Sequence, residues 1–490
     1  MIPLRPYQVR GREMVREEIG RGKRRVLIVL PTGGGKTVLA ADIIKRTLDG
    51  GRKVLFVAHR RELIKQSYDK LIDVGIPEGN VGIIMRGLDR RPHAPVQVAS
   101  IQTLVNRPTP PADVLFIDEA HRALAKSYVT LSDSLPGAVK LGLTATPWRG
   151  DGKGLCEAYD SLVSICTVKE LIADGFLVAP QCYGAPGGTP DVSGVRIVRT
   201  VEGEDYDPRG LANACDQSGL VGDIVANWKA RGGGRRTVVF AASVAHSQHI
   251  AERFRGAGVR AEHLDGTTPV RERDACLARL RAGDCTVVCN CDVLSEGWDM
   301  PEVKCCVLAK PTRSVTKYLQ KVGRVLRPWR DETCVILDHA GCIPQFGFPQ
   351  KDRSSEMTLG ARQKRMSAER GPGVRICTEC FLAYSSELAA CPACGHAPVR
   401  GTGPDMMPEE APGELVPLAE DADPLEGLRD RVNRLCKRCD IRFCGGKYGV
   451  HAMMLKKQTR VALRERTQES LEKCIDILET KLGIRKLEAL

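Results

Sequence analysis

Pro31-Thr32-Gly33-Gly34-Gly35-Lys36-Thr37 is a glycine-rich turn between two regular elements of this sequence. The apolar run before it, Val26–Leu30, predicts a buried strand, and the apolar spacing of residues 38–44 predicts a helix. Such a turn brings backbone N–H groups close to a polyphosphate, and the helix start adds the positive end of its dipole. Lys36 is placed to reach the β- and γ-phosphates, and the Thr37 hydroxyl to ligate Mg²⁺. We therefore expect a nucleotide-binding loop whose floor consists of Thr32, Gly33, Gly34 and Gly35.

The bulk composition narrows the class of protein. A length of 490 residues allows about three domains, and a hydrophobic content of 42% supports buried cores. The net charge of +13 favours a polyanionic partner. Apolar runs stay well below the ~18 residues that span a membrane, and the first residues do not resemble an export signal. We expect a cytoplasmic chain whose 20 cysteines stay reduced, so that paired cysteines bind metal.

Strand-like and helical patterns alternate in two blocks along the chain. The first block predicts strands at 26–30, 54–58, 96–100, 114–117 and 139–143. The second block predicts strands at 237–240, 261–264, 286–289, 304–308 and 334–337. Alternation of this kind indicates parallel sheets covered by helices. We therefore predict an α/β fold with two tandem parallel-sheet domains, residues 1–180 and 181–348, and a cleft between them.

The alternation stops after Gly347. By composition, residues 349–375 form a basic linker and residues 399–426 form an acidic, proline-rich linker. The short segment between them, residues 376–398, predicts a zinc ribbon. Residues 427–490 are basic and have apolar residues at helical spacing, which predicts a small helical domain.

The predicted ribbon rests on two Cys-x-x-Cys pairs, Cys377 with Cys380 and Cys391 with Cys394. Each pair presents two thiolates on one side, and two pairs close a tetrahedron around Zn²⁺. Four protein ligands leave no open coordination position, so the expected metal is structural. A second cluster is Cys436, Cys439 and Cys444, with His451 beyond it. For that cluster we favour core packing of small thiols, with a second zinc site as the alternative.

Asp118 and Glu119 directly follow the predicted strand 114–117, in the stretch Asp118-Glu119-Ala120-His121. The carboxyl end of a strand in an α/β sheet is where ligands bind. Asp118 is placed to hold Mg²⁺ opposite Lys36, and Glu119 to orient and deprotonate an attacking water. The pair could instead cap a helix, but its combination with the Lys36 loop favours phosphoryl transfer from ATP.

Six further stretches occur in the order typical of one enzyme family. They are Arg5-Pro6-Tyr7-Gln8, Ala58-His59-Arg60-Arg61-Glu62-Leu63, Ser100-Ile101-Gln102-Thr103-Leu104, Thr144-Ala145-Thr146-Pro147, Leu294-Ser295-Glu296-Gly297-Trp298-Asp299 and Gln320-Lys321-Val322-Gly323-Arg324-Val325-Leu326-Arg327. With these motifs the chain resembles a superfamily 2 helicase over residues 3–348. Leu30 stands where the strict phosphate-loop pattern has glycine, and the Pro-Thr-Gly form is the one seen in this superfamily. The resemblance implies two RecA-like domains that close on ATP and separate after hydrolysis.

The resemblance also implies roles for individual residues. Tyr7 and Gln8 recognise the adenine, Asp299 contacts the ribose, and Gly297 lies beside it. Arg324 and Arg327 lie three apart on a predicted helix, hence on one face, and act with Gln320 as catalytic residues from the second domain. The implied nucleic-acid contacts are Arg60, Gln102, Thr103 and Thr144.

Several details favour DNA as the substrate. The tail Arg149-Gly150-Asp151-Gly152 and the stretch Ile336–Gly341 resemble the RadD-like and XPB-like branch, whose bacterial members also carry a C-terminal cysteine cluster. We expect an ATP-dependent DNA helicase or translocase that works with repair, recombination or replication proteins. The alternatives are the motor subunit of a restriction or remodelling complex, an RNA helicase and, least favoured, a nucleic-acid-binding adaptor with an inactive ATPase site.

Overall fold

The structure is a computed structural model that describes residues 3–147, 155–185, 189–200, 203–295, 298–330, 333–353, 359 and 373–397. The chain divides into two compact units, residues 1–400 and 401–490, and all described residues belong to the first. The predicted helical domain and the second cysteine cluster therefore lie outside the described residues.

The first sheet contains seven strands within the described ranges, all parallel, in the order β3-β4-β2-β5-β6-β1-β7. They are β1 (Arg25–Val29), β2 (Val54–Ala58), β3 (Val81–Ile84), β4 (Val96–Ser100), β5 (Val114–Asp118), β6 (Val139–Thr144) and β7 (Ser161–Ser164). The strands predicted from the first block are confirmed to within a residue at their ends. β3 and β7, the two edge strands of this sheet, were not predicted.

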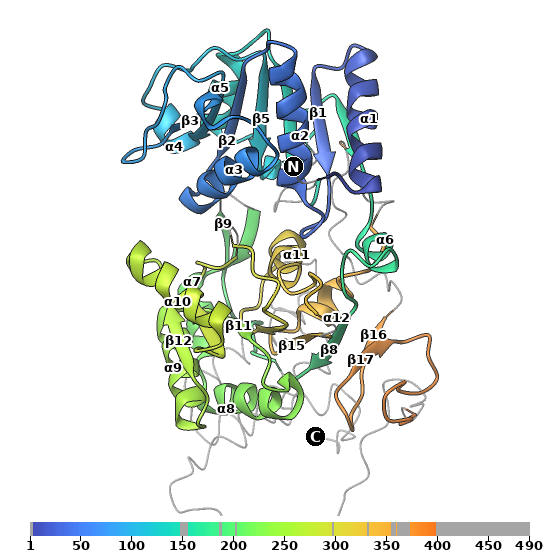
Figure 1. Cartoon of the computed structure of the whole chain (residues 1–490). Helices are drawn as coiled ribbons and strands as arrows, with labels where there is room; N and C mark the ends of the chain where they lie inside the picture. Colours follow the sequence, from blue (N-terminus) through green and yellow to red (C-terminus); the bar gives the residue numbers. More distant parts are fainter. Residues whose placement is uncertain are drawn as a thin grey trace, which may run out of the picture. The chain divides into compact units, whose positions relative to one another are not determined.

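Helices cover both faces of this first sheet (Figure 1). α1 (Pro6–Gly20), α2 (Lys36–Asp49) and α3 (Arg61–Asp73) pack on one face, with core residues such as Phe56 and Phe116 beneath them. α4 (Ile101–Leu104), the short helix η2 (Ala120–Arg122) and α5 (Lys126–Asp133) lie on the other face, and the short helix η1 (Glu78–Asn80) precedes β3. We call this body lobe 1.

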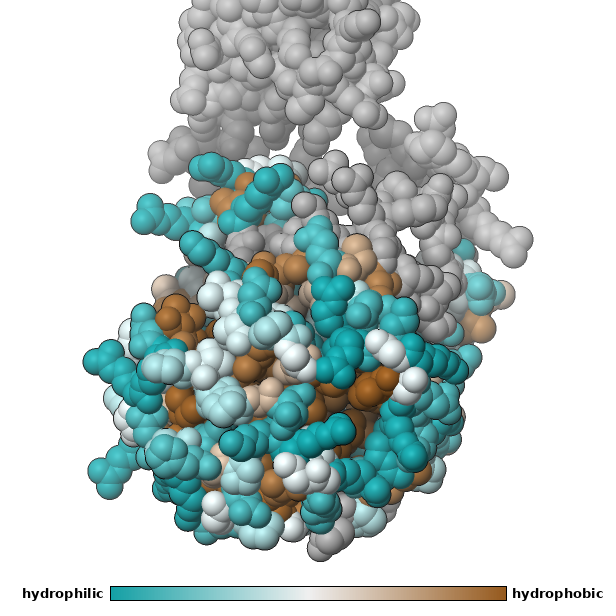
Figure 2. All heavy atoms as spheres, turned by 90° about the horizontal axis from the view of Figure 1, so that it is seen from above, coloured by the Kyte–Doolittle hydropathy of each residue, from teal (hydrophilic) through white to brown (hydrophobic). Residues whose placement is uncertain are grey.

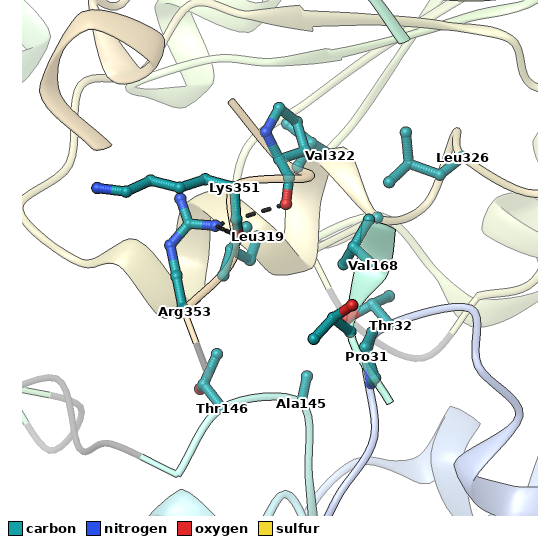
Figure 3. A pocket seen from close by; sticks show the side chains of 13 residues that line it. Pro31, Thr32, Ala145, Thr146, Val168, Leu319, Val322, Leu326, Lys351 and Arg353 are labelled. Atoms are coloured by element: carbon teal, nitrogen blue, oxygen red, sulfur yellow. Dashed lines mark hydrogen bonds between the residues drawn. The ribbon is translucent and has the colours of Figure 1, made fainter. Parts of the chain in front are cut away.

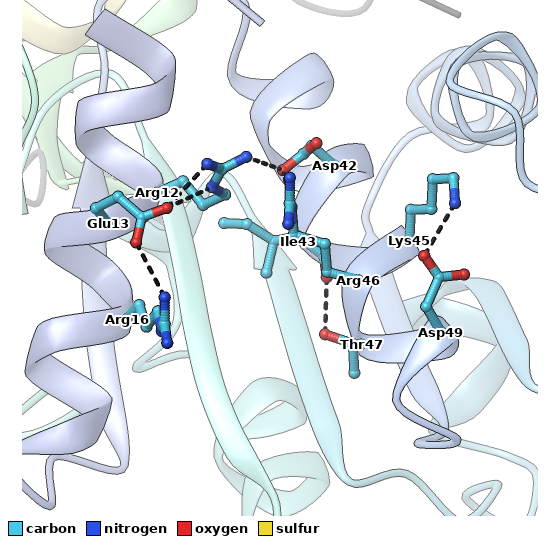
Figure 4. Close-up of polar contacts among 9 residues, drawn as sticks. All are labelled: Arg12, Glu13, Arg16, Asp42, Ile43, Lys45, Arg46, Thr47 and Asp49. Carbon is cyan, nitrogen blue, oxygen red and sulfur yellow. Dashed lines mark hydrogen bonds and ion pairs between the residues drawn. The ribbon is translucent and has the colours of Figure 1, made fainter.

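A polar network joins α1 to α2 (Figure 4). The Arg12 guanidinium donates to the Asp42 carboxylate at 3.2 Å and also to Glu13. Asp42 in turn accepts from Arg46 one turn further along α2. Partly exposed pairs of this kind each contribute about 0.2–1 kcal/mol. Their main consequence is geometric, because they hold α1, which carries Tyr7 and Gln8, beside the helix that begins at Lys36.

The second sheet contains six parallel strands within the described ranges, in the order β12-β13-β11-β14-β15-β8. They are β8 (Pro180–Gly184), β11 (Thr237–Phe240), β12 (Ala261–Leu264), β13 (Val287–Asn290), β14 (Cys305–Leu308) and β15 (Cys334–Asp338). The fold class predicted from sequence, two tandem parallel α/β sheets, is confirmed. β8 comes first in the chain but lies at the sheet edge, next to β15, the last strand in sequence.

Helices also cover both faces of the second sheet, and we call this body lobe 2. α8 (Ser218–Asn227), the helix η3 (Trp228–Gly232) and α9 (Val244–Gly256) cover one face. α10 (Val270–Ala282), α11 (Val315–Val322) and α12 (Cys342–Phe346) cover the other. α6 (Val168–Ala173) lies in the connection between the lobes, and the connection after β8 contains the hairpin β9 (Ile197–Thr200) and β10 (Gly203–Tyr206), followed by α7 (Pro208–Cys215).

The prediction that Arg324 and Arg327 share a helix face is wrong. α11 ends at Val322, and both arginines lie in the non-helical segment that follows. The reason is visible at Gly323, where a Cβ would lie only 2.6 Å from the Cβ of Thr32 in lobe 1. The chain turns out of the helix at the point where it meets the glycine-rich loop, so the two arginines are positioned by loop contacts.

The segment after lobe 2 forms a small antiparallel hairpin, β16 (Val374–Ile376) with β17 (Ala383–Ser385). It packs on the free edge of β8: Leu382 pairs with Tyr183, and Gly184 N–H donates to the Phe381 carbonyl at 3.0 Å. A Cβ on Gly184 would lie 2.3 Å from Ile376, so only glycine allows this approach. Two of the four predicted zinc ligands, Cys377 and Cys380, lie in the loop of this hairpin, and Cys391 and Cys394 lie in the segment that follows it.

On the face seen from above, hydrophilic side chains surround smaller apolar patches (Figure 2). Among the described helices, none has the length and apolarity needed to cross a membrane.

Candidate active site

The glycine-rich loop has the geometry of a phosphate cradle. Gly33 and Gly35 have φ values of 86° and 80°, which favour glycine, and Gly35 is the residue before the first turn of α2. The Lys36 ammonium lies at the loop and donates to the Leu30 carbonyl at 3.4 Å. Burial lowers the pKa of Lys36, and the carboxylates of Glu119 and Asp118 partly offset this. A buried ammonium at a helix start is a site that favours a polyanion.

Tyr7 and Gln8 both hold the same loop. The Tyr7 hydroxyl donates to the Gly34 carbonyl at 2.8 Å. The Gln8 amide donates to the carbonyls of Gly34 and Gly35 at 3.1 and 3.2 Å, and its oxygen accepts from the Arg5 backbone. The structure thus joins α1 to the phosphate loop directly. Adenine recognition by these two residues stays a prediction.

Asp118 and Glu119 lie at the end of β5, and each is only 6% exposed. Asp118 accepts the Glu119 N–H at 3.0 Å. Glu119 has a left-handed backbone (φ 50°, ψ 56°), which is unusual for a residue with a side chain. Its carboxylate lies 3.3 Å from the His121 imidazole. Sequence reasoning gave His121 no role, although it stands two residues after Glu119 in the quoted motif.

Lobe 2 completes the site across the cleft. The Gln320 amide donates to the Glu119 carboxylate at 3.2 Å, in a buried contact between the lobes. Arg324 donates to the carbonyls of Trp298 and Ser295 at 2.9 and 3.4 Å. Arg327 pairs with Asp299 at 2.5 Å, and burial lowers the pKa of its guanidinium. The segment that carries both arginines is close to Gly33, because a Cβ there would lie 3.7 Å from Arg327 Cγ.

Two contacts that the sequence did not reveal hold the segment from Arg324 to Arg327. The Val178 N–H donates to the Leu326 carbonyl at 2.7 Å, and the fully buried Lys304 ammonium donates to the Arg327 carbonyl. Lys304 lies just before β14 and Val178 just before β8. Neither residue belongs to a motif, and a lysine at the start of a strand gives no signal that it is buried.

A cleft of about 630 Å³ is lined by the glycine-rich loop, by the carboxylates of Asp118 and Glu119 and by Arg324 and Arg327 of lobe 2. Its volume is within the ~300–1,000 Å³ typical of small-molecule sites. Its walls carry buried positive groups opposite the paired carboxylates. The donor set fits a nucleoside triphosphate with Mg²⁺: Lys36 and the loop amides for phosphates, and Thr37 with Asp118 for the metal. Glu119 is placed to orient a water, and Arg324 and Arg327 to stabilise the charge that develops during phosphoryl transfer.

The remaining predicted nucleotide contacts are Asp299 and Gly297. The Asp299 side chain is 61% exposed and paired with Arg327, so its predicted ribose contact stays a prediction. Gly297 lies outside the described residues. Phe176 and Arg5 also line the cleft, and their cation–π contact of 4.6 Å was not predicted.

Three of the four predicted nucleic-acid contacts lie near one another on lobe 1. Gln102 donates to the His59 carbonyl at 2.8 Å, which joins the turn that carries Arg60 to α4. Thr103 accepts from the Arg86 backbone at 3.2 Å. Thr144 is different: it is fully buried and donates to the Thr146 carbonyl at 2.6 Å. In this structure Thr144 cannot touch a bound strand, so this part of the prediction is corrected.

The four cysteines of the ribbon converge. Their sulfur atoms all lie within 4.8 Å of one another, with Cys377–Cys394 and Cys380–Cys391 at 3.5 Å. A tetrahedral zinc with bonds of about 2.3 Å requires sulfur separations of about 3.8 Å, so the cluster fits. The residues after the second cysteine of each pair, Phe381 and Gly395, both have positive φ and form the two knuckle turns.

Comparison with known proteins identifies the family. Residues 1–149 match the family described as "Type III restriction enzyme, res subunit", and residues 220–328 match "Helicase conserved C-terminal domain". The two matches together cover just over half of the chain and fall on lobe 1 and lobe 2. The chain belongs to the superfamily 2 helicases.

Individual relatives are distant. This helicase is 29% identical over 370 residues to a 51.5 kDa protein of a Lactococcus phage (isolate 7-9), covering 76% of this chain and 77% of that protein. It is 29% identical over 358 residues to the Saccharomyces cerevisiae protein named "Putative ATP-dependent helicase IRC3", covering 69% of this chain and 51% of that one. Among solved structures, the DNA-bound Type ISP restriction-modification enzyme LlaBIII is similar in fold (TM-score 0.52, 16% identity, 69% of this chain and 27% of that one). The helicase thus spans about half the length of the yeast relative and about a quarter of LlaBIII.

Proposed function

We propose that this helicase is an ATP-dependent motor that translocates on DNA. The observation that carries the proposal is the buried hydrogen bond from Gln320 of lobe 2 to Glu119 of lobe 1. In the proposed mechanism Glu119 orients the attacking water, and this bond supports control of that group by the opposite lobe. ATP hydrolysis and the separation of the lobes then become one event.

The order of events follows from the charges. Before hydrolysis, the polyphosphate neutralises the positive groups that converge on the cleft, Lys36 from lobe 1 and Arg324 and Arg327 from lobe 2, and so favours closure. After hydrolysis and release of phosphate, the same groups repel one another across the cleft. Repeated closing and opening moves lobe 2 relative to a strand held on lobe 1. The candidate residues that bind the strand are Arg60, Gln102 and Thr103. They would contact its phosphates rather than its bases, because a motor must tolerate any sequence.

Three observations favour DNA over RNA. LlaBIII, which is similar in fold, is described as bound to DNA. The N-terminal family match is to a restriction-enzyme subunit. The sequence carries the RadD-like and XPB-like stretch Ile336–Gly341, whose Asp338 accepts three backbone N–H groups at the start of α12. A role in repair or recombination is our first choice.

A second candidate is the motor subunit of a restriction complex, favoured by the same match to a restriction-enzyme subunit. An RNA helicase is the third candidate, and an adaptor with an inactive site is the least favoured, because the described site retains Lys36, Asp118 and Glu119, and both carboxylates raise the pKa of the Lys36 ammonium.

One panel of assays tests the proposal. ATPase rates are measured with single-stranded, duplex and branched DNA and with RNA, together with displacement of streptavidin from biotin-labelled DNA ends and unwinding of labelled forks. We expect DNA to stimulate the ATPase and ATP to drive streptavidin displacement. Stimulation by RNA and by none of the DNAs contradicts the DNA assignment. Unchanged DNA-stimulated ATPase in Lys36→Ala contradicts the assignment of the site.

A further inference from the structure

Residues on one face of α11 and at its end contact several of the lobe 1 segments that form the active site. Gln320, on this face, bonds to Glu119, and Gly323 at the helix end packs against Thr32 of the phosphate loop. Thr316 lies four residues before Gln320 and therefore on the same face, one turn earlier. Thr316 belongs to none of the sequence motifs described above. The last of these motifs begins four residues later, at Gln320.

Thr316 makes a buried contact with the Thr144–Pro147 motif of lobe 1. Its hydroxyl lies 2.9 Å from the Thr146 hydroxyl, and the two side chains are only 6% and 1% exposed. The turn that carries Thr146 is closed by Thr144, which donates to the Thr146 carbonyl at 2.6 Å and accepts the Thr146 N–H at 3.2 Å. Thr146 is thus held by its own strand end on one side and by α11 on the other.

The contact is buried beside a small pocket of mixed lining. The pocket, of about 50 Å³, lies between Ala145 and Thr146 on one side and Leu319 and Val322 of α11 on the other, and the polar side chains of Lys351 and Arg353 also line it (Figure 3). Because both threonines are almost inaccessible to solvent, a hydroxyl that loses its partner pays much of the cost of desolvation, so the pair favours the closed contact.

We propose that Thr316 is a positioning residue that couples the Thr144–Pro147 motif to catalysis, and this rests on the proposed function as a nucleic-acid-driven motor. Thr316 and Gln320 are fixed to the same helix, so a shift of the Thr146 turn moves Gln320 relative to Glu119. The path from the Thr146 turn of lobe 1 to the attacking water therefore runs through one turn of α11. Thr316 extends the functional face of that helix by one turn toward its N-terminus.

Two substitutions at Thr316 separate the hydroxyl from the methyl group. Thr316→Val keeps the branched shape and removes the hydroxyl, whereas Thr316→Ser keeps the hydroxyl and removes the methyl. If the side chain only fills space, the serine variant is the more damaged one. If the hydroxyl pair couples the lobes, the valine variant is the more damaged one.

The experiment measures ATPase rates of the full chain over a range of ATP concentrations, with and without saturating single-stranded DNA. We expect Thr316→Val to lower the DNA-stimulated kcat roughly three- to tenfold, the effect of one buried hydrogen bond, with little change in KM for ATP. Thr316→Ser should stay within about twofold of the wild type. Thermal unfolding of both variants reports whether the fold is retained, and Thr146→Val/Thr316→Val should be no slower than the slower single variant because the two changes remove the same bond.

The outcomes distinguish the two proposals. Wild-type protein that no nucleic acid stimulates overturns the motor function, and the coupling role falls with it. Wild-type stimulation that Thr316→Val retains in full overturns the coupling role alone. A serine variant that is slower than the valine variant also overturns it, because packing then explains the effect.

Discussion

Glu119 adopts a left-handed backbone that costs a side-chain-bearing residue about 1–3 kcal/mol. The turn is retained because it directs the carboxylate toward Gln320 while Asp118 stays at the strand end and accepts the Glu119 N–H. Two adjacent carboxylates thereby point to different tasks within one buried site. The sequence showed the pair and its place after a strand, but local patterns do not reveal the sign of φ at a single residue.

Glu119→Gln should abolish most hydrolysis and leave ATP binding intact. The amide keeps the size of the side chain but cannot take a proton from water, so kcat should fall by about 10²–10⁴. ATPase assays and titration with a fluorescent ATP analogue measure the two effects. Glu13→Gln is the matched control, since that carboxylate is 43% exposed in the α1 network and should change kcat little. A Glu119→Gln enzyme with near-normal kcat would remove Glu119 from the mechanism.

Two buried histidines make lobe 2 sensitive to acid. Burial lowers the pKa of His246 and of His339 to about 4 each. The unfolded chain, with a histidine pKa near 6.5, binds more protons than the folded one between about pH 6.5 and pH 4. Stability is therefore fully present above pH 6.5 and falls as the pH drops toward 4, by roughly 3 kcal/mol for each histidine.

Denaturant unfolding between pH 7 and pH 4 tests this pH dependence. His246→Gln should reduce the pH dependence of the unfolding free energy by about half, because it removes one of the two buried histidines. The glutamine oxygen can still accept the Ala242 N–H that His246 now accepts at 3.3 Å, so the fold should be retained. A variant curve parallel to the wild-type curve would show that His246 carries no part of the pH dependence. His93→Gln is the control, because His93 lies exposed on the surface of lobe 1.

At the scale of elements, strands were predictable and their order was not. Runs such as Val54–Ala58 and Thr237–Phe240 are apolar and short, so pattern alone located them. β8 has the mixed burial of an edge strand, and it joins the second sheet only through pairing with β15, about 150 residues later. Long-range pairing of this kind leaves no local trace, and neither does the unwinding of α11 before Arg324, which the opposite lobe imposes through Thr32.

The zinc ribbon illustrates the same limit. The spacing of its cysteines predicted the cluster, but not the surface on which it packs. The described hairpin packs on β8, with the Arg231 guanidinium over the rings of Tyr183 and Phe381 at 4.9 and 5.4 Å. Phe381 directly follows Cys380, one of the four predicted ligands, so a bound metal would fix the residue that contacts the sheet.

Removal of zinc should therefore loosen the edge of lobe 2. A structural four-thiolate site contributes folding free energy, so chelation should unfold the hairpin and expose the Gly184 N–H that donates to Phe381. Hydrogen exchange at β8 should accelerate at least about tenfold, and metal analysis should find one zinc per chain before chelation. Phe381→Ala should keep the zinc and give a smaller acceleration. Unchanged exchange at β8 in zinc-free protein would show that the ribbon does not brace the sheet.

At the scale of the described body, the lobes meet beyond the ATP site as well. Arg273 at the start of α10 pairs with Glu62 at the start of α3 at 2.8 Å, and Arg60 donates to the Val293 carbonyl at 3.3 Å. These contacts lie beside the proposed nucleic-acid-binding residues, of which Arg60 is one. They favour the closed arrangement without touching the nucleotide, so we expect them to set how readily ATP closes the cleft.

Glu62→Lys should raise KM for ATP by roughly two- to fivefold and lower kcat less, because it replaces an attraction across the lobes by a repulsion between partly exposed groups. The combination of Glu62→Lys with Arg273→Glu should recover most of the loss, since the pair is restored with reversed charges. Near 1 M salt, where the screening length is about 3 Å, the single variant and the wild type should converge. ATPase titrations at low and high salt measure all three effects. A double variant that is no better than the single ones would show that the two side chains do not act on each other, and closure would then depend on the other contacts between the lobes, such as Arg60–Val293 and Thr146–Thr316.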